Sequence, residues 1–111
     1  MNRALSVRPA TLGDLDAIVE LRLALLGEYA DHPFYARLRP DVRVRAYELY
    51  RAQVMSPHET IFIAERSRRV VGLLRCAETA TSPVLLPDRY CYVSSVFVAA
   101  EERRTGVLRA L

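Results

Sequence analysis

The most informative stretch of this 111-residue sequence runs from Val96 to Leu111 and reads VFVAAEERRTGVLRAL. It begins with apolar residues typical of a strand, and residues 90–95 extend that strand backwards, which gives YCYVSSVFV over residues 90–98. A short acidic turn follows, and then come two arginines and Gly106. We expect a helix to begin near this glycine, so that a strand, a loop and a helix start follow one another.

This arrangement of residues favours the binding of an anion at the start of the expected helix. Backbone N–H groups at the start of a helix have no partner within the helix, and the helix dipole makes that end positive. A phosphate is stabilised there, Gly106 lets it approach the backbone, and Arg103, Arg104 and Arg109 add charge-assisted hydrogen bonds. The Walker pattern does not apply because the sequence has no lysine, and its four glycines are too scattered for a dinucleotide fingerprint.

Hydrophobic periodicity predicts the elements that precede this stretch. Thr11 and Asp14 resemble a capping box at the start of the first helix. Arg22 interrupts the apolar stripe of that helix, so we expect its stem to pack there while its head reaches water. The expected elements are a strand over 5–9, helices over about 12–29 and 40–55, a three-stranded meander over 60–65, 70–77 and 90–98, and a final helix start. The fold class is therefore α/β (α+β), with one domain over residues 1–111.

Composition narrows the function classes. The net charge is +3 and every basic residue except histidine is arginine, which suits phosphate recognition or reflects a GC-rich genome. No basic stripe or stacking platform favours nucleic acid, and no run of residues favours a membrane span or a secretory signal, so we expect a cytoplasmic protein. Cys76 and Cys91 match no zinc pattern, so we expect no metal and interpret both as buried strand residues.

The segment Arg103-Arg104-Thr105-Gly106-Val107-Leu108 resembles the acetyl-CoA motif of the GNAT N-acetyltransferases, Q/R-x-x-G-x-G/A. Val98 stands five residues before the motif arginine, as in that family, and the order of elements matches over the whole chain. The opening residues 7–11 and Asp14 look like the family's first strand and helix cap. The chain thus looks like a GNAT-like half domain that ends within the cofactor motif.

The resemblance implies a co-substrate, acetyl-CoA, and a set of residues around it. Val96 and Val98 would hold the pantetheine arm, and Arg103, Arg104, Thr105, Gly106, Val107 and Leu108 would hold the diphosphate. Leu108 stands where the family prefers Gly or Ala; it either crowds the diphosphate or points harmlessly into helix packing, and we favour the second. Tyr92 occupies the place where many family members carry a catalytic Glu. Tyr92 and Ser94 share one face of the strand and could hold a water there; alternatively, Tyr92 is an aromatic residue that only packs.

The acceptor implied by the resemblance is a primary amine of a small molecule or peptide. Tyr29, His32, Phe34 and Tyr35 lie between the first two helices, where the family shapes its acceptor pocket, although ordinary loop packing would explain them too. The family's second half is missing after Leu111, so we expect a truncated transferase that is inactive alone. The alternative is an inactive interaction or regulatory module that forms a homodimer through its open sheet edge.

Overall fold

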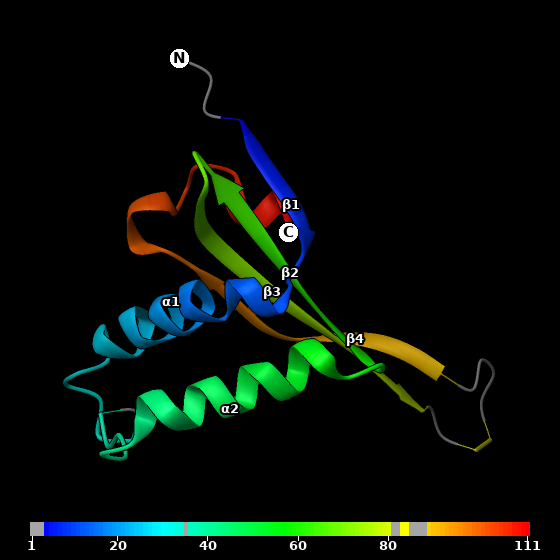
Figure 1. Ribbon diagram of the computed structural model, residues 1–111, viewed down its shortest axis with the longest axis horizontal. Coiled ribbons are helices and arrows are strands. Elements are labelled where there is room, and N and C mark those ends of the chain that lie inside the picture. The colour runs from blue at the N-terminus through cyan, green and yellow to red at the C-terminus, as the bar shows by residue number, and fades with distance from the viewer. Residues whose placement is uncertain (1–3, 35, 81–82, 85–88) are drawn as a thin grey trace.

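The computed structural model describes residues 4–34, 36–80, 83–84 and 89–111. Its centre is an antiparallel sheet in the order β1-β2-β3-β4 (Figure 1). The strands are β1 (Leu5–Pro9), β2 (Glu59–Arg66), β3 (Arg69–Ala80) and β4 (Arg89–Val98). The predicted α/β class and meander are confirmed, and β1 adds a fourth strand that pairs with β2 along its whole length.

Two helices cover one face of this sheet. They are α1 (Leu15–Gly27), preceded by a single 3-10 turn, η1 (Leu12–Asp14), and α2 (Val42–Met55). The stripe of apolar residues on α1 places Ile18 and Val19 fully inside, where they meet Ile63 and Leu73 of the sheet. Asp14 accepts hydrogen bonds from the amide and the hydroxyl of Thr11, so the predicted cap is present.

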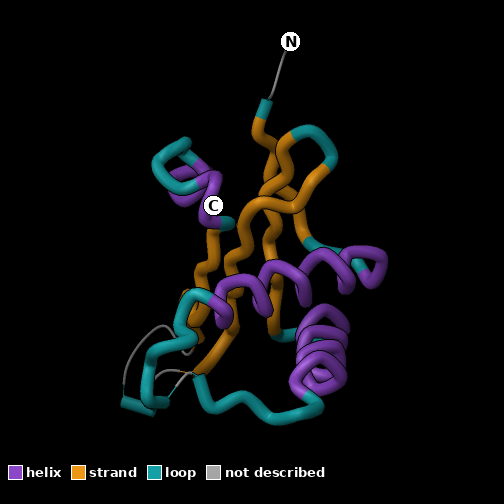
Figure 2. Tube along the Cα trace, turned by 90° about the vertical axis from the view of Figure 1, so that its left-hand side faces the viewer, coloured by secondary structure: helices purple, strands orange, loops and turns teal. Residues whose placement is uncertain are grey.

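The last helix lies on the opposite face of the sheet. Figure 2 shows the C-terminal helix across the strands from α2. This helix, α3 (Val107–Ala110), follows the 3-10 turn η2 (Ala100–Glu102), and its Val107 is 1% exposed between Ala64 and Val71. A Cβ built on Gly72 would lie 2.6 Å from Cγ1 of Val107, so the missing side chain of Gly72 lets α3 sit against the sheet.

Strands β3 and β4 extend beyond the other two as a two-stranded arm (Figure 1). The register between them shifts at Arg75/Cys76, which leaves Ser94 as the extra residue of β4. A bulge of this kind bends a strand and changes the direction of its side chains. Because no further strand pairs with β4 in the described part of the chain, one row of its backbone groups is available along the edge.

Two expectations need correction. The first helix ends at Gly27, not Tyr29, because residues 28–31 form turns in which the amide of Tyr29 bonds to the carbonyl of Leu26. Cys91 is exposed and Cys76 only half-buried, because β4 is an edge strand with little covering either face. Among the described helices, none has the length and apolar character that crossing a membrane requires.

Candidate functional site

The loop between β4 and α3 turns sharply at two left-handed positions. Arg104 has φ 67° and Gly106 has φ 92°, a region that glycine enters without steric cost. A Cβ built on Gly106 would meet no atom within 4 Å, so open space lies in front of this backbone. The carbonyl of Gly106 accepts the first helical bond, from Ala110, and the next amides begin α3. The predicted helix start at this glycine is confirmed.

A hollow of about 870 Å³ opens beside this loop. Its walls come from the end of α1, the second half of β4, and the β4–α3 loop. Most of the residues predicted to bind the cofactor line it: Val96, Val98, Arg103, Arg104, Gly106 and Leu108. Thr105 and Val107 do not; the hydroxyl of Thr105 donates to the carbonyl of Glu102, and the Val107 side chain is in the core.

Leu108 differs from the interpretation that we favoured. Its side chain is 63% exposed and lines the hollow, so it does not point into helix packing. The reason is the short α3, whose inward position is taken by Val107. The Leu108 side chain therefore borders the space beside the start of α3.

Arg103 is tied to α1 rather than free for a ligand. Its two terminal nitrogens donate to the two carboxylate oxygens of Glu28 at 2.7 and 2.8 Å, and its Nε donates to the carbonyl of Val98 at 3.2 Å. The Arg103 guanidinium lowers the pKa of Glu28, and the carboxylate in turn raises the pKa of Arg103. This fork anchors the loop to the end of α1. Arg104 and Arg109 are exposed, and the described part of the chain gives neither a carboxylate partner.

The candidate catalytic hydroxyls lie next to an ion pair that sequence reasoning missed. Arg75 of β3 donates to Glu59 of β2, with Nε at 2.7 Å, and both side chains are about 20% exposed. Arg75 also donates to the hydroxyl of Ser94, and Tyr92 is a weaker partner that helps Glu59 raise the pKa of Arg75. The bulge in β4 brings these four side chains together from three strands. No local pattern marks them, because they meet only through strand pairing.

The predicted acceptor residues are in part close together. Tyr29 lines the 870 Å³ hollow. The His32 ring stands edge-on to the Tyr29 ring, with 6.2 Å between the two ring centroids. Nδ1 of His32 accepts a hydrogen bond from the amide of Phe34 at 3.0 Å. Phe34 is 73% exposed. Tyr35 lies outside the described residues.

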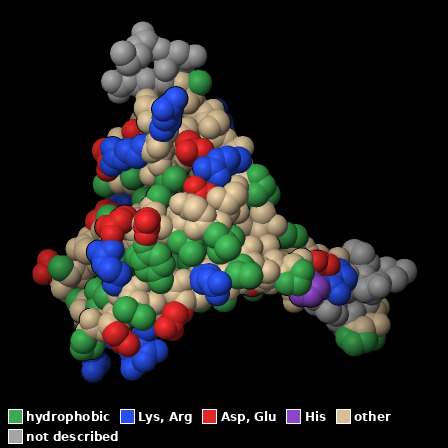
Figure 3. Space-filling model, viewed as in Figure 1, with side chains coloured by type: hydrophobic (Ala, Val, Ile, Leu, Met, Phe, Trp, Pro, Cys, Tyr) green, Lys and Arg blue, Asp and Glu red, His purple; other side chains and the backbone are tan. Residues whose placement is uncertain are grey.

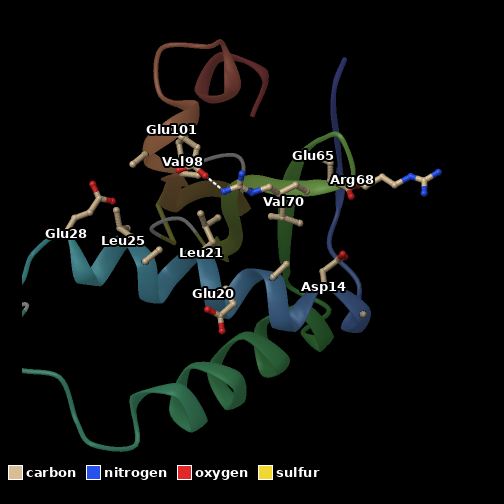
Figure 4. A pocket seen from close by; sticks show the side chains of 16 residues that line it. Asp14, Glu20, Leu21, Leu25, Glu28, Glu65, Arg68, Val70, Val98 and Glu101 are labelled. Carbon is tan, nitrogen blue, oxygen red and sulfur yellow. Dashed lines mark hydrogen bonds and ion pairs between the residues drawn. The ribbon is translucent and has the colours of Figure 1, made fainter. Parts of the chain in front are cut away.

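A second hollow, of about 730 Å³, lies between α1 and the β2–β3 turn. Figure 4 shows acidic side chains around it, including Glu20, Glu28 and Glu101, while Arg68 points away. These acids are already neutralised: Glu20 pairs with Arg43, Glu28 with Arg103, and Glu101 with Arg69. Figure 3 shows the same mixture of basic and acidic side chains over the visible face. In the described residues, no cluster of three metal-ligating side chains occurs.

An antiparallel sheet with two helices on one face, whose edge strand passes through a left-handed turn into a short helix on the other face, defines a class of mixed α/β folds. The chain belongs to the acetyltransferase (GNAT) family, whose model matches residues 21–111. The GNAT resemblance that the motif at Arg103–Leu108 indicated is therefore confirmed. A search of curated proteins finds no match.

Solved structures show the same fold. A predicted acetyltransferase from Clostridium acetobutylicum, solved with acetyl-CoA, has a TM-score of 0.70 at 15% identity, over 96% of this chain and 67% of the other. An aminoglycoside N-acetyltransferase solved with CoA has a TM-score of 0.71 at 16% identity, over 100% and 66%. An aminoglycoside 6'-N-acetyltransferase from Acinetobacter baumannii has a TM-score of 0.68 at 16% identity, over 95% and 64%. The chain thus spans about two thirds of the length of these proteins.

Proposed function

We propose that this chain acts in N-acetyl transfer from acetyl-CoA to a primary amine of a small molecule or peptide. One observation carries the proposal. In this member of the GNAT family, the left-handed Gly106 at the start of α3 borders the hollow beside β4. The aminoglycoside enzymes with the same fold act on amines, which supports the general class of acceptor.

The residues of the hollow fit the chemistry of acetyl-CoA. The diphosphate would lie over Gly106, where space is open, with the amides from Arg104 to Leu108 and the side chains of Arg104 and Arg109 as donors. The pantetheine arm carries amides, and the edge of β4 at Val96 and Val98 offers backbone groups to pair with them. When bound, acetyl-CoA supplies the thioester whose acetyl group the amine receives.

We assign Tyr92 and Ser94 to the handling of the acceptor. A guanidinium only donates hydrogen bonds, so the Ser94 oxygen accepts from Arg75 and keeps its own hydrogen for another partner. Ser94 would use that hydrogen to orient a water, with Tyr92 beside it, and this water would pass the ammonium proton to bulk solvent along the exposed strand. Tyr29, His32 and Tyr35 belong to the segment that we propose for acceptor contact.

The open side of β4 sets a limit on the isolated chain. Val96 is 38% exposed on this edge strand, so a pantetheine arm beside it would have protein along one side only. We therefore propose that the 111-residue chain binds acetyl-CoA weakly by itself and does not turn over.

Titration of the isotopically labelled chain with acetyl-CoA, followed by amide NMR, tests this function. We expect saturable shifts of the amides at residues 94–98 and 104–109, with weak affinity. Gly106→Asp should abolish them, because the new carboxylate repels the diphosphate and the left-handed backbone is strained. Gly13→Asp adds the same charge outside the hollow and should leave affinity unchanged. Unchanged affinity of Gly106→Asp for acetyl-CoA would contradict the proposed site. Tight binding of acetyl-CoA to the monomeric chain would contradict the proposal that protein lies along only one side of the pantetheine arm.

A second candidate function is that of an interaction module. The edge strand exposes Tyr90 (49%), Tyr92 (43%) and Val93 (54%), and an unpaired edge can add a strand from a second copy of the chain. We expect a concentration-dependent dimer in light scattering, and Val93→Lys should return it to the monomer by placing a charge in the edge. A strictly monomeric parent at high concentration would rule this module out.

A further inference from the structure

Arg22 lies in the apolar stripe of α1, is half-buried, and its guanidinium lies over a ring of the sheet. Its guanidinium carbon is 4.6 Å from the centre of the Phe97 ring on β4, a distance typical of a cation–π contact. Tyr50 of α2 lies near enough for the Arg22 charge to oppose the burial that raises the pKa of Tyr50. Arg22 thus stands where α1, α2 and β4 meet.

No carboxylate compensates this charge in the part of the chain that the structure describes. Most described arginines have an acidic partner: Arg8, Arg39, Arg43, Arg45, Arg66, Arg69, Arg75, Arg89 and Arg103. Those without one, apart from Arg22, are exposed: Arg37, Arg51, Arg68, Arg104 and Arg109. Arg22 alone among the described arginines is both half-buried and without a carboxylate, although partial burial of an unpaired charge is costly.

The position of Arg22 relates it to the proposed acceptor side of the molecule. Phe97, on which the guanidinium rests, lines the 870 Å³ hollow, and so does Tyr29, which we propose for acceptor contact. On the same face of the sheet, the carboxylate of Glu59 is held by Arg75. Arg22 is therefore left with an uncompensated positive charge on this face, among the residues that the structure describes.

We propose that Arg22 binds an anionic group of the acceptor, so that the preferred acceptor is a primary amine that also carries a carboxylate. This inference rests on the proposed acetyl transfer and narrows its acceptor class. An arginine already oriented on an aromatic ring presents its fork of donors to a carboxylate, whereas a polycationic acceptor would be repelled. A free amino acid and an acidic side chain of a peptide are the two sources of this carboxylate, and both present the same group.

Binding can be tested without turnover, through the Nε–Hε NMR signal of Arg22. The small-molecule arm compares 4-aminobutyrate with 4-aminobutyramide, and the peptide arm compares Ala-Asp amide with Ala-Asn amide. In at least one arm we expect a saturable shift of the Arg22 signal and about tenfold tighter binding of the carboxylate than of its amide, as a hydrogen bond to a charged group provides. The arm that responds identifies the source of the carboxylate.

Variants separate recognition from folding. Arg22→Met keeps an unbranched side chain over Phe97 and should bind each acid and its amide equally, while Arg22→Lys should keep part of the preference. Arg51→Met, at an exposed arginine of α2, should keep all of it. Equal affinities in the parent, or a preference that survives Arg22→Met, would overturn the proposal. Failure of the acetyl-transfer proposal is seen separately, as an acetyl-CoA titration that leaves the amides around Gly106 unmoved.

Discussion

At one edge of the sheet, β1 is a five-residue strand whose Arg8 donates to Asp14 and to Glu65, so that strand, helix cap and neighbouring strand are joined. At the other edge, β4 is twice as long and most of its residues are exposed. Its ties to the rest of the molecule include the pairing with β3, the contact of Phe97 with Arg22, and the fork between Arg103 and Glu28 just beyond the strand. The first edge is built for stability, and the second leaves backbone and side chains available to a ligand.

This difference teaches where binding capacity resides in the chain. The core of Ile18, Val19, Ile63 and Leu73 lies under α1 and α2, toward the side of β2 and β3. The left-handed Gly106, the Tyr92–Ser94 pair and most residues that line the 870 Å³ hollow belong to β4 or follow it. Sites commonly occupy such less stable parts, positioned by a rigid scaffold.

The largest expected effect comes from the same substitution on two adjacent strands. Val71 of β3 is 1% exposed and Val93 of β4 is 54% exposed. Val71→Ala removes two buried methyl groups and leaves a cavity between the sheet and α3, so we expect the free energy of unfolding to fall by about 2–3 kcal/mol. Val93→Ala should change it by less than about 0.5 kcal/mol. Urea unfolding followed by circular dichroism measures both.

Equal losses in these two variants would show that β4 is covered in solution, for example by a second copy of the chain. In that case the loss for Val93→Ala should depend on protein concentration. A loss that is large for Val71→Ala and small for Val93→Ala at every concentration confirms the contrast between the strands.

The element order and the glycine loop could be predicted from sequence because they depend on local signals. Apolar spacing locates α1 and the strands, and a glycine after two arginines locates the start of α3. The Thr11–Asp14 cap is local in the same sense, with partners three residues apart. Such features are decided within one turn or one strand, and sequence records them directly.

Contacts between distant segments could not be predicted in this way. Glu59 and Arg75 are sixteen residues apart, and their approach to Ser94 depends on the register shift between β3 and β4. Periodicity predicts that the stem of Arg22 packs while its head reaches water, but it does not predict that the guanidinium lies over the Phe97 ring of β4. The exposure of Cys91 and Leu108 depends equally on what covers β4 and α3, which periodicity does not reveal.

The smaller effect concerns the β1 edge and its response to acid. Hydrogen bonds from Arg8 lower the pKa of Asp14 from 3.8 to about 2, and the Asp14 side chain is 12% exposed. A lowered folded-state pKa means that the ionised carboxylate stabilises the fold above about pH 4, and that this stabilisation is lost as the pH falls toward 2. We expect it to amount to about 1–2 kcal/mol, since the partner Arg8 is 40% exposed and partly screened.

Comparison of the parent chain with Asp14→Asn by urea unfolding at several pH values measures this contribution. The difference in unfolding free energy should be full at pH 6 and should shrink between about pH 4 and pH 2, because protonated Asp14 then resembles the amide. Asp16→Asn, an exposed neighbour on α1 with no ion pair in the described residues, is the matched control and should follow the parent at each pH. A difference between parent and Asp14→Asn that stays constant with pH would mean that Arg8 does not hold the charged carboxylate. The β1 edge would then owe its stability to strand pairing alone, and the contrast with β4 would rest on burial rather than on charge.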